Sequence, residues 1–365
     1  MSVPRDLTGV SAAAAALLAR AASADGRDRT RLRHAIDDLF LPDDARLDDR
    51  TRANLTTLMR SLIATVEGEV GSHAARLLTA RGDATLADRL TSPETDIADR
   101  LIASGLLRDA ELVGELLDRV LETQLGGALP ITAPAHPDRP SLAARLSRSS
   151  DRVVASSALA LIIAAGARSG HDAGPPTRTD LPGQLHQRLV WWVAAALRGR
   201  LADGDAAEAL DRALAEAAQR SLSAHDESDR LEAVASRLAA AIDARPDELG
   251  ALLLESLCDR NLPLFTALLA RALGVDYAAA RTVVLDPEGE RLVLGLRAIG
   301  VERSTLAQIA LLLTEADARR SEETLPDFVD AASALEPAQA RARLAPLRLH
   351  PHYRAALLAL DERSR

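Results

Sequence analysis

Alanine and leucine dominate the apolar residues of this chain, and valine and isoleucine supply most of the rest. Hydrophobic residues make up 47% of the 365 positions, but aromatic residues make up only 2%. Alanine and leucine have high helix propensity, whereas strands favour β-branched and aromatic side chains. This imbalance predicts an all-α protein. The chain length predicts two domains or one elongated repeat array.

Helical periodicity recurs along most of the chain. Segments 92–107 and 147–162 both place an Asp ahead of an Ile/Val–Ala pair and continue into an apolar helix, as weakly similar repeats would. We therefore expect an irregular, HEAT-like array of helical hairpins in two helical halves. The clearest stripe has the i, i+3, i+4, i+7 spacing of one helix face and consists of Leu55, Leu58, Met59, Leu62, Ile63 and Val66.

Two segments rich in proline, glycine and polar residues interrupt the periodicity, at 127–141 and at 167–183. Such segments are typical of exposed loops or linkers. The predicted organisation is an N-terminal helical array over residues 1–126, linkers over 127–183 around a buried helix at about 141–167, and a C-terminal helical domain over 184–365.

The longest apolar run, residues 153–167, is shorter than the ~20 residues that a transmembrane helix needs, so we expect a buried core helix there. The Ala-rich N-terminal segment superficially resembles a secretory signal, but Asp6 and Arg20 favour an ordinary first helix. The single cysteine, Cys258, excludes an intramolecular disulfide framework. These features together predict a cytoplasmic protein.

All 44 basic residues are arginine, because the chain contains no lysine. They are outnumbered by 53 acidic residues, which gives a formal net charge of -9. A protein that binds nucleic acid without regard to sequence needs a basic surface, so this charge predicts no nucleic-acid partner. The absence of a polybasic run likewise predicts no binding to an anionic membrane surface.

The segment "DPEGE", residues 286–290, raises the question of a metal or phosphate loop. A calcium loop of the EF-hand type spreads its oxygen ligands over about twelve residues, and the three acids of this segment would repel phosphate. A turn after one helix and before the next explains the same residues. Upstream, we expect Gly274 to end a helix and Asp276 to cap the following one.

Four histidines are candidate site residues. His350 and His352 flank a proline without a local third ligand, which indicates a helix-start turn more than a metal site. His171 lies in a linker, where catalysis is poorly preorganised. His186 sits on a predicted helix and is the one candidate for a phosphate-accepting histidine, an idea that rests on little else.

Sequence motifs for catalysis are absent. The chain has no GxSxG, HExxH, Walker or GxGxxG pattern. We therefore expect a protein that is not an enzyme, with no cofactor and no metal.

The tandem Trp191–Trp192 is the most unusual local feature. Adjacent residues of a helix point about 100° apart, so both indoles enter a core only when the helix is covered over a wide arc. One interpretation is a central helix beneath neighbouring hairpins. The other leaves an indole at a groove or dimer interface, where tryptophan is enriched as an anchor. The two tryptophans are therefore the candidate interaction residues.

A longer stretch, residues 247–313, carries a family resemblance. It contains "LPLFTALLARALGV", then "DPEGE", then "LRAIGV" before another apolar helix. In this order the segments resemble the domain-of-unknown-function 2336 family of alphaproteobacterial helical-repeat proteins. Upstream, residues 39–70 also resemble the beginning of that family. The resemblance implies a helical, HEAT-like fold and brings no reaction with it.

These observations favour a non-catalytic scaffold or regulator that binds protein partners in the cytoplasm along a concave helical surface. A homodimer is also compatible with the apolar helices. The alternative is a sensor that responds to a small molecule or nucleotide in a pocket between the two helical halves.

Overall fold

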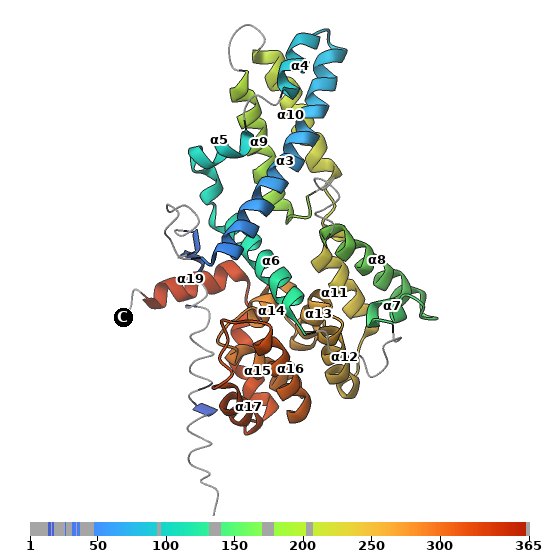
Figure 1. The fold of residues 1–365 in the computed structure, drawn as a ribbon, viewed down its shortest axis with the longest axis vertical. Helices are drawn as coiled ribbons and strands as arrows, with labels where there is room; N and C mark the ends of the chain where they lie inside the picture. The colour runs from blue at the N-terminus through green and yellow to red at the C-terminus, as the bar shows by residue number, and fades with distance from the viewer. Residues whose placement is uncertain are drawn as a thin grey trace, which may run out of the picture. The chain divides into compact units, whose positions relative to one another are not determined.

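A computed structural model describes residues 47–92, 96–130, 140–169, 179–201 and 207–362, with isolated positions between residues 14 and 36. Helices account for the regular structure of these residues, which contain no strand, so the all-α prediction is confirmed (Figure 1). The Ala-rich N-terminal segment and His171 lie largely or wholly outside the described residues.

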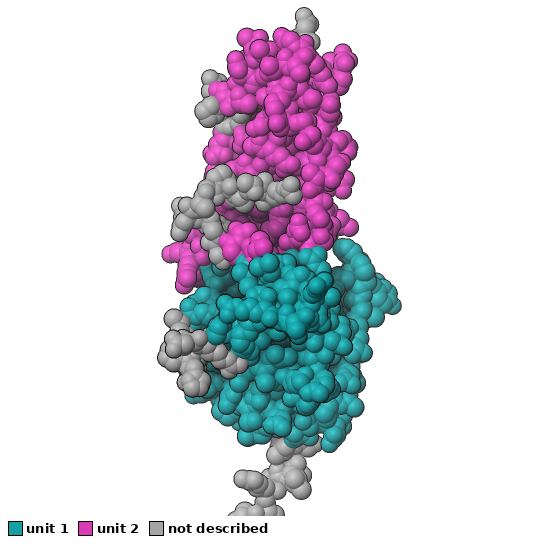
Figure 2. All heavy atoms as spheres, turned by 90° about the vertical axis from the view of Figure 1, so that its right-hand side faces the viewer, with its two compact units in different colours: residues 1–32, 121–162, 234–365 teal, residues 33–120, 163–233 magenta. Residues whose placement is uncertain are grey.

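The chain divides into two compact units, which Figure 2 shows in different colours. Unit 1 comprises residues 1–32, 121–162 and 234–365, and unit 2 comprises residues 33–120 and 163–233. Neither unit is continuous in sequence, so the division differs from the predicted halves 1–126 and 184–365. Three helices continue from one unit into the other, and an unbroken helix carries no boundary signal: α6 (Ala110–Ala128), α8 (Arg152–Ser169) and α11 (Leu231–Ile242).

Unit 2 is built on one long helix, α3. It begins where the Asp48 side chain accepts a hydrogen bond of 2.9 Å from the Thr51 amide, and it is followed by Gly82 at a φ of 93°. The apolar stripe predicted from Leu55 to Val66 faces the core, where Leu58 is only partly covered. The unit's other elements are α4 (Ala84–Thr91), α5 (Ile97–Ser104), α9 (Gly183–Arg200) and α10 (Ala207–Ala224), with α3 at Asp49–Ala80 and short 3₁₀ turns at Leu106–Arg108 and Glu227–Asp229.

Unit 1 is a set of shorter helices. The Asn261 side chain accepts a hydrogen bond from the Leu264 amide at the start of α13, and Gly274, at a φ of 67°, ends the helix. The Asp276 side chain then accepts a hydrogen bond from the Ala279 amide, as expected of a cap. The elements are α7 (Leu142–Leu146), α12 (Pro246–Cys258), α13 (Leu262–Leu273), α14 (Tyr277–Val284), α15 (Glu290–Ala298), α16 (Arg303–Glu315), α17 (Leu325–Ser333), α18 (Pro337–Arg343), a 3₁₀ turn (Ala345–Arg348) and α19 (Pro351–Glu362).

The "DPEGE" segment forms the corner between α14 and α15. The amide of Gly289 donates to the carbonyl of Asp286 over 3.2 Å, and Gly289 has a left-handed φ of 77°. Glycine adopts that conformation without a steric penalty. The predicted turn is confirmed.

The predicted buried helix at about 141–167 is corrected by the structure. The segment forms α7 and α8, and α8 buries only one stripe, which consists of Val154, Ala158 and Leu161. Its remaining large apolar side chains are exposed. Composition predicted the helix correctly but not its burial, because burial depends on which neighbours pack against it.

Candidate functional site

The exposed surface of α8 is the most unusual feature of the described residues. Four large apolar side chains lie on it: Val153 is 64% exposed, Leu159 53%, Ile162 40% and Ile163 63%. Between Arg152 and Arg168 the helix has no charged residue. A helix that is apolar on all sides is normally buried, so an exposed one marks a surface that binds something.

A second helix, α19, also exposes apolar side chains, at Tyr353, Leu357 and Leu360. The charged residues of α19 are Arg354, near its start, and Asp361 and Glu362, at its end. The uncharged run is therefore six positions long in α19, 355–360, and fifteen positions long in α8, 153–167.

The two tryptophans lie on α9. Both side chains are half-buried and pack against the apolar core of unit 2. The helix packs against α3, α5 and α10, so it is covered over a wide arc. The interaction role of Trp191 and Trp192 stays a prediction, and their packing gives both residues a structural role as well.

His186 lies one turn from the start of α9 and is only 3% exposed. Its Nδ1 lies 2.7 Å from the Thr179 hydroxyl, and its ring stacks on His225 with the centroids 4.1 Å apart. Burial and electrostatic repulsion from the adjacent His225 lower the pKa of His186 to about 4. A phosphate-accepting histidine must be reachable by a donor, so this buried ring does not suit that role.

The loop before α9 holds the densest ionic contacts of unit 2, which we call the Asp180 cluster. The Asp180 carboxylate pairs with Arg119 and Arg168, and its carbonyl accepts hydrogen bonds from Arg119 (2.7 Å) and Arg230 (2.9 Å). Burial alone would raise the pKa of Asp180, but the charges of Arg119 and Arg168 hold it well below its usual range. With Glu115 and Glu232, three acids balance three arginines.

A comparable group in unit 1, the Asp286 cluster, lies at the "DPEGE" corner. Asp286 is 1% exposed, and its carboxylate lies 3.4 Å from Arg291. The buried Arg320 lies 3.5 Å from Asp317 and donates a hydrogen bond to the Val284 carbonyl. The local sequence does not indicate that Asp286 and Arg320 are buried in one cluster, because Arg320 stands 34 positions after Asp286.

Charge balance and burial make both clusters structural elements in our interpretation. Within the described parts of the chain, no three His, Cys, Asp or Glu side chains are arranged to hold a metal ion.

His350 is the residue before α19. Its Nδ1 accepts a hydrogen bond of 3.3 Å from the His352 amide, which is the pattern of a helix cap. The two rings are 5.2 Å apart and tilted by 36°. The helix-start interpretation is therefore confirmed for this pair.

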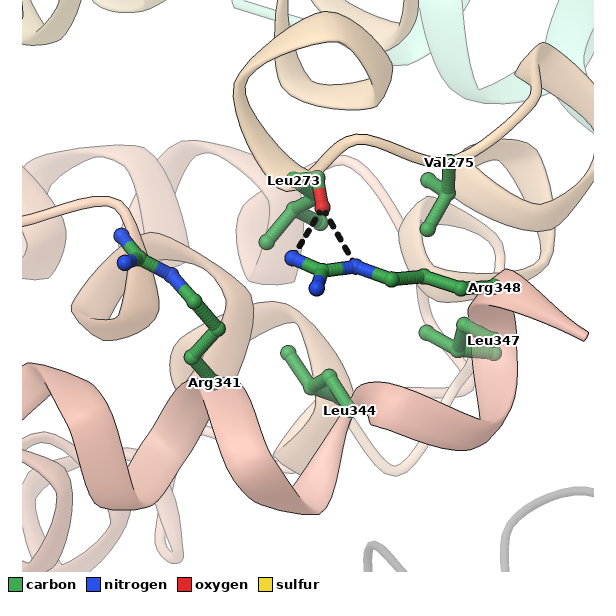
Figure 3. Close-up of a pocket in the computed structure, with 6 residues that line it drawn as sticks. All are labelled: Leu273, Val275, Arg341, Leu344, Leu347 and Arg348. Atoms are coloured by element: carbon green, nitrogen blue, oxygen red, sulfur yellow. Dashed lines mark hydrogen bonds between the residues drawn. The ribbon is translucent and has the colours of Figure 1, made fainter.

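Figure 3 shows a hollow between α18 and the end of α13, lined by Leu273, Val275, Arg341, Leu344, Leu347 and Arg348. It has no space for a water-sized molecule, and Arg348 spans it to donate to the Leu273 carbonyl over 2.9 Å. A second hollow, beside Gly289 and Arg320, has room for only about 10 Å³. Ligand pockets typically enclose about 300–1,000 Å³, so neither hollow is a ligand site.

No single helix among the described residues is long and apolar enough to cross a bilayer. The helices α13 and α14 together meet the length and composition required, but they are bent by 113° relative to each other. Most residues of both helices are buried within unit 1.

Residues 135–346, more than half of the chain, match the model of a family described as an uncharacterised protein conserved in bacteria (DUF2336). The chain belongs to this family. The part matched to DUF2336 runs from just before α7 to just after α18 and includes α8, whereas the resembling upstream segment 39–70 lies outside it. No curated protein and no solved structure matches the chain.

Proposed function

We propose that this DUF2336 protein is a non-catalytic, cytoplasmic scaffold or regulator that works by binding protein, with α8 as its main binding surface. The exposed, uncharged face of α8 carries this proposal. Fully burying a leucine or isoleucine side chain contributes about 1.5–3 kcal/mol. Covering four side chains that are each about half exposed would therefore contribute on the order of 3–6 kcal/mol to a complex.

The face is also long enough for a partner helix. α8 has 18 residues, which at 1.5 Å per residue gives a length of about 27 Å. Its large exposed apolar side chains lie between Val153 and Ile163, about 15 Å of that length, with the exposed Ser156 among them. A HEAT-like arrangement with a concave binding surface remains part of the proposal.

The alternative, a small-molecule or nucleotide sensor, has less support. Both hollows found in unit 1 are too small for such a ligand. The tryptophans remain secondary candidates for partner contact, because each has a partly exposed indole.

The proposal is tested by placing a photo-reactive amino acid at position 163 of the full-length protein in its native cells. The matched control carries the same group at position 360 of α19, since Ile163 and Leu360 are exposed to 63% and 65%. We expect a discrete protein adduct from position 163, in near-stoichiometric yield, and none of comparable yield from position 360. Absence of any protein adduct from position 163 would overturn α8 as a binding surface.

A further inference from the structure

We propose that the partner of the α8 face is the α8 face of a second copy of this chain, related by a two-fold axis perpendicular to the helix. This inference rests on the proposed function, because it requires α8 to be a protein-binding surface. It names the occupant of that surface.

The first argument is charge. In a two-fold dimer each patch meets itself, so any charged residue near the axis meets a like charge. The face of α8 between Arg152 and Arg168 has no such residue. In a chain whose residues are 27% charged, fifteen consecutive uncharged positions on a helix exposed to solvent make a surface that can pair with itself without repulsion.

The second argument is the ends of the helix. A perpendicular two-fold axis makes the two helices antiparallel, so the partly positive N-terminus of each lies beside the partly negative C-terminus of the other. The N-terminus of α8 carries Asp151, whose carboxylate accepts a 2.8 Å hydrogen bond from the Val153 amide. At the opposite end, the charge of Arg168 is already paired with Asp180 and with Glu232. The exposed Arg152, also at the N-terminus, would lie beside the partly negative C-terminus of the other helix.

The third argument is shape. Leu159 and Ile163 are one turn apart on the exposed face, and the small residues Ser156 and Ala160 lie beside them. Large side chains of one helix can thus enter the spaces above small side chains of the other, as in packed helix pairs. The large residues supply the apolar area, and the small ones let the helices approach.

The test measures the mass of the full-length protein by light scattering over a range of concentrations, with a monomer mass of 38.7 kDa. Two variants, Leu159→Asp and Ile163→Asp, each place a carboxylate near the axis of both copies. Leu360→Asp on α19 is the control of matched exposure. Because the substituted side chains are exposed, far-UV circular dichroism should show a native helical content for all three variants.

We expect the wild type and Leu360→Asp to have twice the monomer mass. Leu159→Asp and Ile163→Asp should raise the dimer dissociation constant by about 100-fold or more, because two unpaired carboxylates would be buried at the axis. A Leu159→Cys variant made in a Cys258→Ser background should form a disulfide-linked dimer under mild oxidation, whereas Leu360→Cys should not.

A wild type that stays monomeric up to ~100 μM, or a dimer that only Leu360→Asp disrupts, would overturn the second copy as partner. These results differ from failure of the proposed function. If position 163 forms an adduct with a different protein while the chain is monomeric, α8 still binds protein and only the second copy is excluded. If position 163 forms no adduct at all, both proposals fail.

Discussion

The two units of this protein are built from helices of different length, and they differ in the contacts that stabilise those helices. In unit 2, α3 has 32 residues and both α9 and α10 have 18, and they close on a continuous apolar core. In unit 1, the successive helices α13, α14 and α15 have 12, 8 and 9 residues. Every helix leaves about four carbonyls without a partner at its C-terminus, so short helices leave a larger share unsatisfied.

In unit 1, arginine side chains donate hydrogen bonds to these C-terminal carbonyls. The last carbonyl of α13, at Leu273, accepts from Arg348, and that of α15, at Ala298, accepts from Arg341 over 2.8 Å. The last carbonyl of α14 accepts from Arg320. In unit 2 the arginines of the Asp180 cluster instead bind a loop carbonyl and carboxylates. We infer that arginine side chains from distant segments stabilise unit 1, whereas long apolar stripes stabilise unit 2.

The positions of the tryptophans allow the unfolding of the two units to be followed separately. Trp191 and Trp192 are its only tryptophans, and both lie in unit 2. Tryptophan fluorescence therefore follows the unfolding of unit 2, while far-UV circular dichroism follows both units.

The largest effect is expected from Arg320→Met in unit 1. The change removes the buried guanidinium beside Asp317 and the hydrogen bond to the Val284 carbonyl. Removing one partner of a buried ion pair costs about 3–5 kcal/mol, and denaturant unfolding followed by circular dichroism measures it. Arg303→Met is the control, because Arg303 makes an exposed ion pair with Asp330 and should cost less than about 1 kcal/mol. Equal costs for the two variants would show that buried arginine does not stabilise unit 1.

A comparable loss is expected from Leu55→Ala in unit 2. Leu55 is fully buried in the stripe of α3, and such a truncation costs about 2–5 kcal/mol. The transition followed by tryptophan fluorescence should move to lower denaturant concentration, whereas Arg320→Met should leave that transition in place. If both variants shift both signals together, the units unfold as one cooperative body and the comparison is wrong.

Acid should weaken unit 2 through His186. Its pKa is about 4 in the folded protein, below the ordinary 6.5, so the unfolded chain binds the proton more tightly between these values. The stabilising contribution is complete above pH 6.5 and is lost as the pH falls towards 4, by about 3 kcal/mol. The free energy of unfolding from tryptophan fluorescence should show this loss.

The matched variant is His186→Gln, which should flatten the pH dependence between 6.5 and 4 whatever its stability at neutral pH. Carboxylates of the Asp180 cluster titrate at lower pH, because the pKa values of Asp180 and Glu232 lie below their usual range. An unchanged slope in the variant would contradict the assignment to His186.

The smallest effect is expected from Arg348→Met in unit 1. Arg348 is exposed, and the variant loses its hydrogen bonds to the Leu273 carbonyl while keeping an apolar stem (Figure 3). A single hydrogen bond of this kind contributes about 1 kcal/mol. Arg343→Met, an exposed arginine at the end of α18, is the control and should change stability by less than about 0.5 kcal/mol. A result for Arg348→Met no larger than the control would limit carbonyl capping to the buried Arg320.

Local structure was predictable where its cause is local. The stripe of α3, the glycine that ends α13, the Asp276 cap and the corner at residues 286–290 each depend on a few neighbouring residues. The burial of Asp286 and the stacking of His186 on His225 were not predictable. His225 stands 39 positions after His186, and the Asp286 cluster includes Arg320, which stands 34 positions after Asp286, so no local spacing in the sequence connects them.

The exposed face of α8 was not predictable from the sequence either. The apolar run 153–167 predicted a helix, and α8 is that helix, but the run was expected to be buried. An apolar composition shows that a helix can be buried, but it does not specify which other elements pack against it. Which side of α8 is exposed depends on the elements that pack against it, and these are known only from the tertiary structure.

The sequence by itself determined that this chain is all-α, where several of its helices begin and end, and to which family it belongs. Helix propensity, capping and periodicity act over a few residues, and the family match reads residue order directly. Only the tertiary structure decided how the segments divide into two units, which arginines bind which helix ends, and that α8 turns an apolar face outward. Those outcomes depend on contacts between residues far apart in the chain, whose free energies are set by packing and burial rather than by local preference.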